Sequence, residues 1–139
     1  MDVKRAIKQI ETAVEKMETA MGEPVFDEWI LIGRQGGEWK LLHYAGPRPD
    51  TFLNDFREDM AALRRTLDLS SVQTGDFAFS HEGQGTGFDA YMCIGPDVLV
   101  LFNNTAKDTG AITADPRWTA AQVHFSNLLE SFLADSCLL

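Results

Sequence analysis

Cysteine is scarce in this sequence, and long apolar runs are absent. The two cysteines are Cys93, inside an apolar strand pattern, and Cys137, in the C-terminal tail. This placement is not that of a disulfide framework and suits a reducing compartment, so we expect a cytoplasmic protein. No apolar run approaches the roughly 20 residues that a membrane span needs. The first residues alternate charged and apolar side chains, which predicts no signal peptide and no secretion.

Basic residues are also few relative to acidic ones. The chain has 12 Lys and Arg against 21 Asp and Glu, a net charge of −9. Phosphate backbones and anionic lipid surfaces repel such a domain, so we predict neither a nucleic acid nor a membrane as partner. The 139 residues, 45% of them hydrophobic, are enough to form one domain, 1–139, without a metal or disulfide staple.

Apolar periodicity predicts three helices and five strands. The first helix runs over 3–21, between Asp2 as N-cap and Gly22 as terminator. The second begins after Asp50 and carries an apolar stripe over 52–67, and the third follows Asp115-Pro116 and ends near 134. A loop containing Gly110 precedes the third helix. The predicted strands cover 26–34, 39–45, 76–81, 88–94 and 98–103.

The order of elements is therefore α-β-β-α-β-β-β-α. Every link between strands is short except the one that passes through the second helix. This predicts an α+β fold, a roughly five-stranded, mainly antiparallel sheet with three helices. The segment 98–102 (VLVLF) is apolar on both faces, which places it centrally in the sheet.

Residues that could carry chemistry are scattered along the chain. His43, His81 and His124 show no metal-ligand spacing, so we predict no metal and no cofactor. His81 as a general base has no identifiable nucleophile beside it. Cys93 is expected to be buried and inert. We therefore assign no catalytic residue and favour a protein that is not an enzyme, with an enzyme using His81 or Cys93 as the less favoured reading.

Three glycines, Gly83, Gly85 and Gly87, lie between two predicted strands. A phosphate-binding glycine loop needs a helix directly after it, and here a strand follows. We therefore interpret the segment as a hairpin tip with positive φ angles. As an exposed tip, it is a candidate loop contact for a partner, together with His81 at its mouth.

Polar residues at two strand ends allow a functional and a structural interpretation. Asp27 and Glu28 point to opposite faces of their strand, so they cannot form a catalytic pair, and we expect edge-strand charges that discourage aggregation. The segment 103–105 (NNT) forms hydrogen bonds of its own turn or lines a pocket.

The first helix is the best candidate interface. Its apolar stripe packs on this chain's own sheet or against a second copy in a homodimer, and both remain open. The stripe consists of Val3, Ile7, Ile10, Val14 and Met17.

The element order and the segment 88–103 (FDAYMCIGPDVLVLFN), which has the form of paired late strands with a tight turn, resemble the roadblock (dynein light chain) family. That family belongs to the profilin-like and longin-like group and has no catalytic signature. Its members homodimerise and bind small GTPases or motor components as regulators or scaffolds. The resemblance implies a non-enzymatic, dimeric protein-interaction module with a possible small GTPase as partner.

The same order of elements also fits a sensor domain that binds a small molecule in a sheet-lined pocket. Trp29, Trp39, Tyr44 and Met92 would line that pocket; otherwise they belong to the core.

Overall fold

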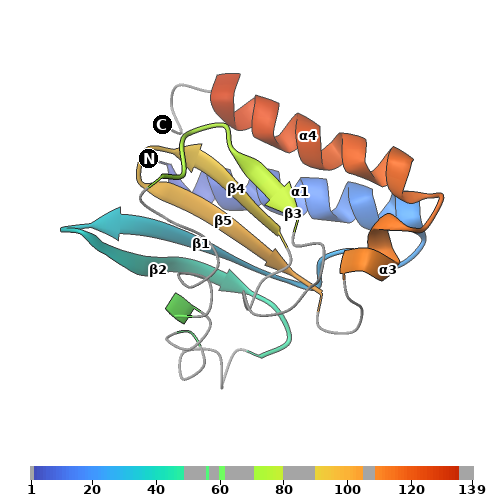
Figure 1. The fold of residues 1–139 in the computed structure, drawn as a ribbon, viewed down its shortest axis with the longest axis horizontal. Helices are drawn as coiled ribbons and strands as arrows, with labels where there is room; N and C mark the ends of the chain where they lie inside the picture. The colour runs from blue at the N-terminus through green and yellow to red at the C-terminus, as the bar shows by residue number, and fades with distance from the viewer. Residues whose placement is uncertain are drawn as a thin grey trace.

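The computed structural model describes residues 2–48, 56, 60–61, 71–79, 90–104 and 109–134. It confirms the α+β class and the five-stranded antiparallel sheet (Figure 1). The elements are α1 (Val3–Met21), β1 (Glu28–Gln35), β2 (Glu38–Ala45), β3 (Phe77–Phe79), β4 (Ala90–Gly95), β5 (Val98–Asn103), α3 (Thr109–Thr113) and α4 (Trp118–Ala134).

The strands lie in the order β2-β1-β5-β4-β3, so β5 is central, as its apolar pattern predicts. β1 and β2 form a hairpin through Gly36 and Gly37, whose φ angles of 60° and 82° favour glycine. The position of β1 corrects one prediction. Because β1 lies between β2 and β5, Glu28 is not on an edge strand and does not protect an edge.

The first helix has the predicted ends. The side chain of Asp2 accepts a hydrogen bond from the Arg5 backbone N at 3.1 Å. At the other end Gly22 adopts φ 72° and donates its N–H to the Glu18 carbonyl at 2.8 Å. These two contacts satisfy backbone groups that a helix cannot pair internally, and they set the length of α1.

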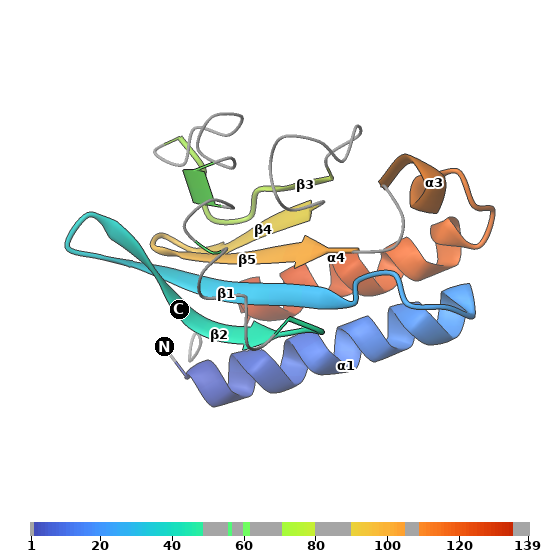
Figure 2. The same cartoon turned by 90° about the horizontal axis from the view of Figure 1, so that it is seen from below.

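Helices α1 and α4 lie side by side on one face of the sheet (Figure 2). Their buried residues pack with inward-facing side chains of the strands, and Phe26, Phe102 and Phe125 form the aromatic centre of this core. Alternation along β4 sends Met92 and Ile94 to this face and Cys93 to the other. The predicted two-faced pattern of β4 is therefore confirmed.

A second apolar cluster covers the opposite face of the sheet. It contains Ile30, Ile32, Leu99 and Leu101, all fully buried, and Met60 packs on them. Most of the predicted second helix lies outside the described residues. Its described positions 56, 60 and 61 are helical, and the burial of Met60 on this face agrees with an amphipathic helix on the sheet.

The segment before α4 differs from the prediction of a plain loop. It contains the short helix α3, which buries Ile112 in the core under the helices. Helix α4 then begins at Trp118, and the carboxylate of Asp115 accepts a hydrogen bond from the Arg117 backbone N at 2.9 Å. The buried side chain of Ile112 anchors this segment to the core.

Candidate functional site

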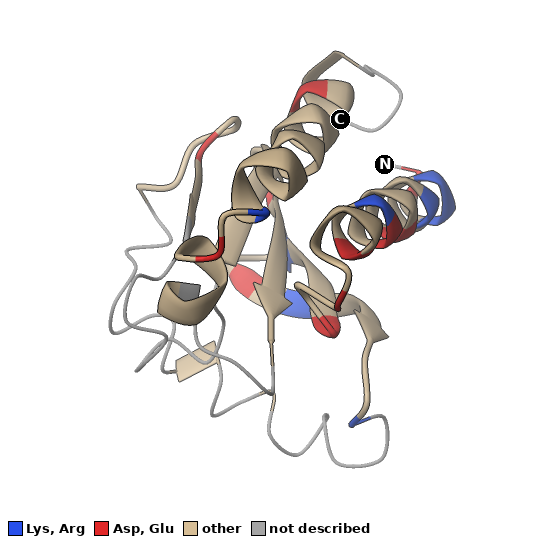
Figure 3. Ribbon diagram, turned by 90° about the vertical axis from the view of Figure 1, so that its right-hand side faces the viewer, with Lys and Arg blue, Asp and Glu red and all other residues tan. Residues whose placement is uncertain are grey.

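A groove runs along the outer side of the helix pair, between α1 and α4. Its volume is about 490 Å³. The wall formed by α1 carries Arg5, Lys8 and Lys16, which lie on one side of the helix because residues three and four apart share a face. In Figure 3 the two helices lie side by side, and the basic residues of α1 are blue.

Further polar side chains complete the groove. Gln9 and Thr12 come from α1, and His124, Asn127 and Ser131 come from α4. The Ser131 hydroxyl donates to the Gln9 Oε1 at 2.9 Å and so joins the two helices across the groove. The buried side chains of Ala13 and Leu128 form an apolar floor. Donors and acceptors above an apolar floor can bind a peptide main chain or an anion.

The charge of this groove is opposite to that of the protein. Among the residues that the structure describes, no acidic side chain lines it, although the chain carries −9 overall. Within the described part of the chain, no carboxylate lies within ion-pair distance of the Lys8 or Lys16 ammonium group. The acids of α1, Glu11, Glu15 and Glu18, occupy a neighbouring face of the helix.

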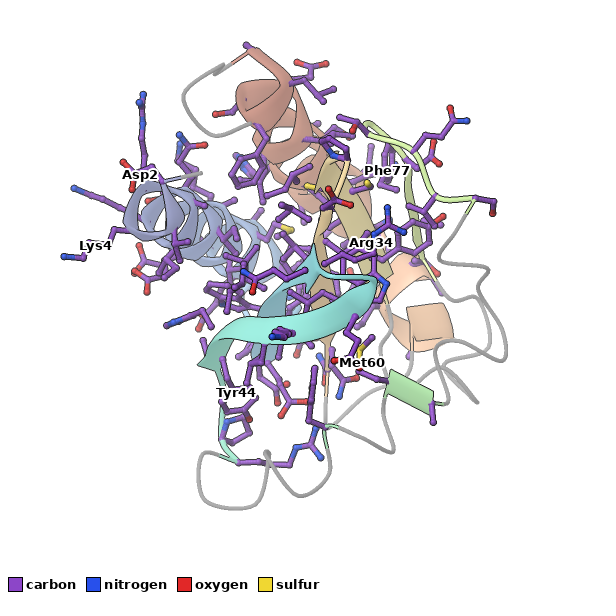
Figure 4. All side chains as sticks on the ribbon, turned by 90° about the vertical axis from the view of Figure 1, so that its left-hand side faces the viewer. Asp2, Lys4, Arg34, Tyr44, Met60 and Phe77 are labelled. Carbon is purple, nitrogen blue, oxygen red and sulfur yellow. The ribbon has the colours of Figure 1, made fainter. Side chains whose placement is uncertain are left out.

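A second polar cluster lies where β1, β2 and β5 end together. Glu28 has a fully buried side chain and accepts four hydrogen bonds. Arg48 donates to it twice, from Nε at 2.7 Å and from a terminal guanidinium nitrogen at 2.6 Å. The Tyr44 hydroxyl donates at 2.6 Å and the Asn103 amide at 3.1 Å. Figure 4 shows Tyr44 on the strand that contributes it, β2.

The electrostatics of this cluster favour the ionised carboxylate. Burial by itself raises the pKa of Glu28, but the hydrogen bonds from Arg48, Tyr44 and Asn103, with the charge of Arg48, outweigh burial and lower it below 4.5. Burial, and next the hydrogen bond to Glu28, raises the pKa of Tyr44, which keeps its hydroxyl protonated as a donor. All these groups are engaged with one another, so we interpret the cluster as a structural clasp and not as an acid–base site.

The chain approaches this clasp closely at Gly46. A Cβ atom at residue 46 would lie 2.6 Å from the Tyr44 hydroxyl oxygen and 2.9 Å from Cγ of Glu28. A larger residue would therefore displace the hydrogen-bonded side chains, which explains the glycine at this position.

The predicted interface stripe on α1 divides into two groups. Ile10 and Met17 are fully buried in the core of their own chain and offer no surface to a second copy. Val3, Ile7 and Val14 are partly buried and pack against the same core. The candidate loop contacts His81, Gly83, Gly85 and Gly87 lie outside the described residues.

The remaining candidate residues, Cys93, Asn103 and Asn104, form contacts that stabilise the fold. Cys93 is buried with its thiol 3.1 Å from the Gly95 carbonyl oxygen, and burial raises its pKa, as expected of an inert thiol. Asn103 and Asn104 both form hydrogen bonds with distant parts of the chain. Asn103 binds Glu28, and the Asn104 amide donates to the Val25 carbonyl at 2.9 Å, so both tie the end of β5 to the chain that enters β1.

The four residues proposed to line a ligand cavity do not lie together. Trp29 and Met92 belong to the core beneath the helices, and Trp39 and Tyr44 pack on the opposite face of the sheet. Trp39 and Tyr44 have opposite parity in β2 but share a face, because the pairing of β1 with β2 shifts register between Leu31 and Ile32. Alternation along the strands therefore could not have placed all four residues.

Sequence reasoning missed the basic groove. Its signal was the recurrence of basic or polar side chains at Arg5, Gln9, Thr12 and Lys16, which is a helical face in its own right. The contribution of α4 had no such signal, because only the packing of the two helices shows which of its faces borders α1.

Comparison of the chain with models of protein families, with curated proteins and with solved structures finds no significant match. In the part of the chain described above, no helix is long and apolar enough to cross a membrane, and no group of three His, Cys, Asp or Glu residues is arranged to hold a metal ion.

Proposed function

We propose that this chain is a cytoplasmic, non-enzymatic protein-interaction module that acts as a homodimer and regulates or scaffolds a small GTPase in the manner of roadblock proteins. The order of the described elements, α-β-β-β-β-β-α-α with a partly described helical segment between β2 and β3, supports the resemblance on which this proposal rests. The observation that carries the dimer is the edge of the sheet at β3.

β3 is the outermost strand and pairs with β4 only within the described sheet. Such an edge can pair with the same edge of a second copy, which gives a two-fold symmetric dimer with a continuous sheet. β3 has three residues, so main-chain hydrogen bonds across this edge are few. Phe77, whose side chain is 40% exposed, would supply apolar contact beside them (Figure 4).

The opposite edge is less suited to self-association. β2 carries the exposed charged residues Glu38 and Lys40, and charges on an edge strand disfavour pairing with another chain. Ile10 and Met17 are fully buried, and the other three residues of the α1 stripe pack in part against the same core, so less of that stripe is exposed for an interface. The β3 edge therefore replaces α1 as the proposed dimer interface.

Sedimentation equilibrium of the purified chain tests the dimer. We expect a reversible dimer, and Phe77→Lys should weaken it by about 2 kcal/mol, roughly thirtyfold in affinity, because a charge replaces an apolar contact in the interface.

The matched control is Val123→Lys, which places the same charge at a 52% exposed apolar position on α4 and should leave the dimer unchanged. A wild-type chain that stays monomeric throughout the accessible concentration range would contradict the proposal. Equal weakening by both variants would remove β3 as the interface.

The partner class has its own test. A small GTPase from the same organism is prepared in two samples, one bound to GDP and one bound to a GTP analogue. Each sample is titrated with the chain in a calorimeter. Binding to one nucleotide state in preference to the other is expected of a regulator. A dimer that binds neither form would leave the module without a GTPase partner.

A further inference from the structure

We infer that the groove between α1 and α4 is a docking site for an acidic segment of a partner protein. This inference deepens the proposed function, because it names the chemistry of a partner at a surface separate from the β3 edge. It rests on the charge, the length and the hydrogen-bonding groups of the groove.

The charge of the groove selects an anionic occupant. Arg5, Lys8 and Lys16 line it, and none of the described lining residues is acidic. These three basic residues share one face, although the chain as a whole has an excess of 9 negative charges. A site of charge opposite to the rest of the surface attracts an acidic ligand locally while the remainder of the protein repels nonspecific anions.

The length of the groove selects a segment of chain over a single small anion. Lys8 and Lys16 are eight residues apart on α1, which corresponds to about 12 Å along the axis, and Arg5 extends the basic row to about 16 Å. One phosphate or carboxylate cannot contact both ends of that row. An extended peptide of about five residues covers the same length.

The neighbouring surface excludes longer polyanions. Glu11, Glu15 and Glu18 lie on the adjoining face of α1. A nucleic acid or an anionic membrane would extend past the groove and meet these carboxylates, which repel it. A short acidic peptide fits within the groove and can also hydrogen-bond through its main chain to Gln9, Thr12, Asn127 and Ser131.

Fluorescence anisotropy with a labelled peptide of about five glutamates tests the inference, because that length spans the groove. The wild-type chain should bind the peptide, and the affinity should fall as salt is added. The variant Lys8→Glu with Lys16→Glu should lose about tenfold or more in affinity, since two attractive charges become repulsive. Both side chains are exposed, and a thermal melt of the variant checks that it folds.

The matched control is Lys4→Glu with Lys40→Glu, which reverses the charge of two exposed lysines that do not line the groove. Both double variants change the net charge equally, so the control should bind the peptide with nearly wild-type affinity. Absence of binding to the wild type, or equal loss in both variants, would overturn the inference.

Other anions serve as competitors in the same assay. The competitors are inorganic phosphate, a short DNA duplex and vesicles with anionic lipid. If one of them displaces the labelled peptide at a lower concentration than unlabelled peptide does, the inference is overturned. The Phe77→Lys variant should bind the peptide normally. Failure of peptide binding and failure of dimerisation are therefore separate results.

Discussion

At the scale of single residues, Glu28 shows how a buried charge is maintained. Its carboxylate accepts hydrogen bonds from Arg48, Tyr44 and Asn103, which come from two separate parts of the chain, the end of β2 with the residues after it and the end of β5. Removing one donor leaves the buried carboxylate with fewer hydrogen bonds in a low-dielectric environment, and that is costly. The clasp therefore joins the ends of β1, β2 and β5 through one buried charge.

Glu28→Gln should lower the free energy of unfolding by about 2 kcal/mol, because the amide keeps the size of the side chain but loses its charge opposite Arg48. Urea denaturation followed by circular dichroism measures the change. The exposed Glu38→Gln should stay within about 0.5 kcal/mol of the wild type. A similar loss in both variants would show that the clasp adds no stability.

The same residue predicts a pH dependence. The pKa of Glu28 is lower in the folded chain than its ordinary 4.5, so its contribution to stability is present above that value and is lost as the pH falls through the folded-state pKa. The wild type should therefore lose stability more steeply than Glu28→Gln as the solution is acidified below about pH 4.5. Parallel curves for the two proteins would contradict the lowered pKa.

At the scale of elements, α1 has two working faces. One face buries Ala6, Ile10, Met17 and Met21 in the core. Another face carries the basic side chains that line the groove between α1 and α4. The apolar stripe therefore belongs to the domain's own core, and the polar face is the one left to meet a partner. Periodicity identified the stripe, but it could not say what covers it.

Ile10→Ala should destabilise the domain by about 2–4 kcal/mol, because it removes a fully buried side chain between α1 and the sheet and leaves a cavity. Thermal and urea unfolding measure the loss. Glu11→Ala, one residue further on an exposed face, should change stability by about 0.5 kcal/mol or less. A stability loss that appeared only under conditions that favour the dimer would point instead to an interface through Ile10.

At the scale of the whole molecule, the net charge of −9 predicts opposite effects of salt on dimerisation and on peptide binding. Two copies of the same acidic chain repel each other, so added sodium chloride should strengthen the dimer by screening that repulsion. The same salt should weaken binding of a glutamate peptide to the groove. Sedimentation and anisotropy over one series of salt concentrations check both signs, and a common direction would mean that one proposal has the wrong interface chemistry.

Much of this architecture was readable from the residues. The caps Asp2 and Gly22 set the ends of α1, the apolar segment 98–102 located the central strand, and the alternation along β4 assigned its faces. These features are local, since each depends on residues a few positions apart. The predicted edge position of Glu28 was wrong because strand order depends on contacts between distant segments.

The amino-acid sequence by itself determined most of the elements, the two-faced character of β4 and the excess of acidic residues, because propensity, periodicity and charge are properties of neighbouring residues. Only the tertiary structure decided that Glu28 meets Arg48, that Trp29 and Trp39 lie on opposite faces, and that α4 completes a basic groove on α1. Those relations arise from the packing of segments far apart in the chain, and packing minimises exposed apolar area over the whole molecule at once.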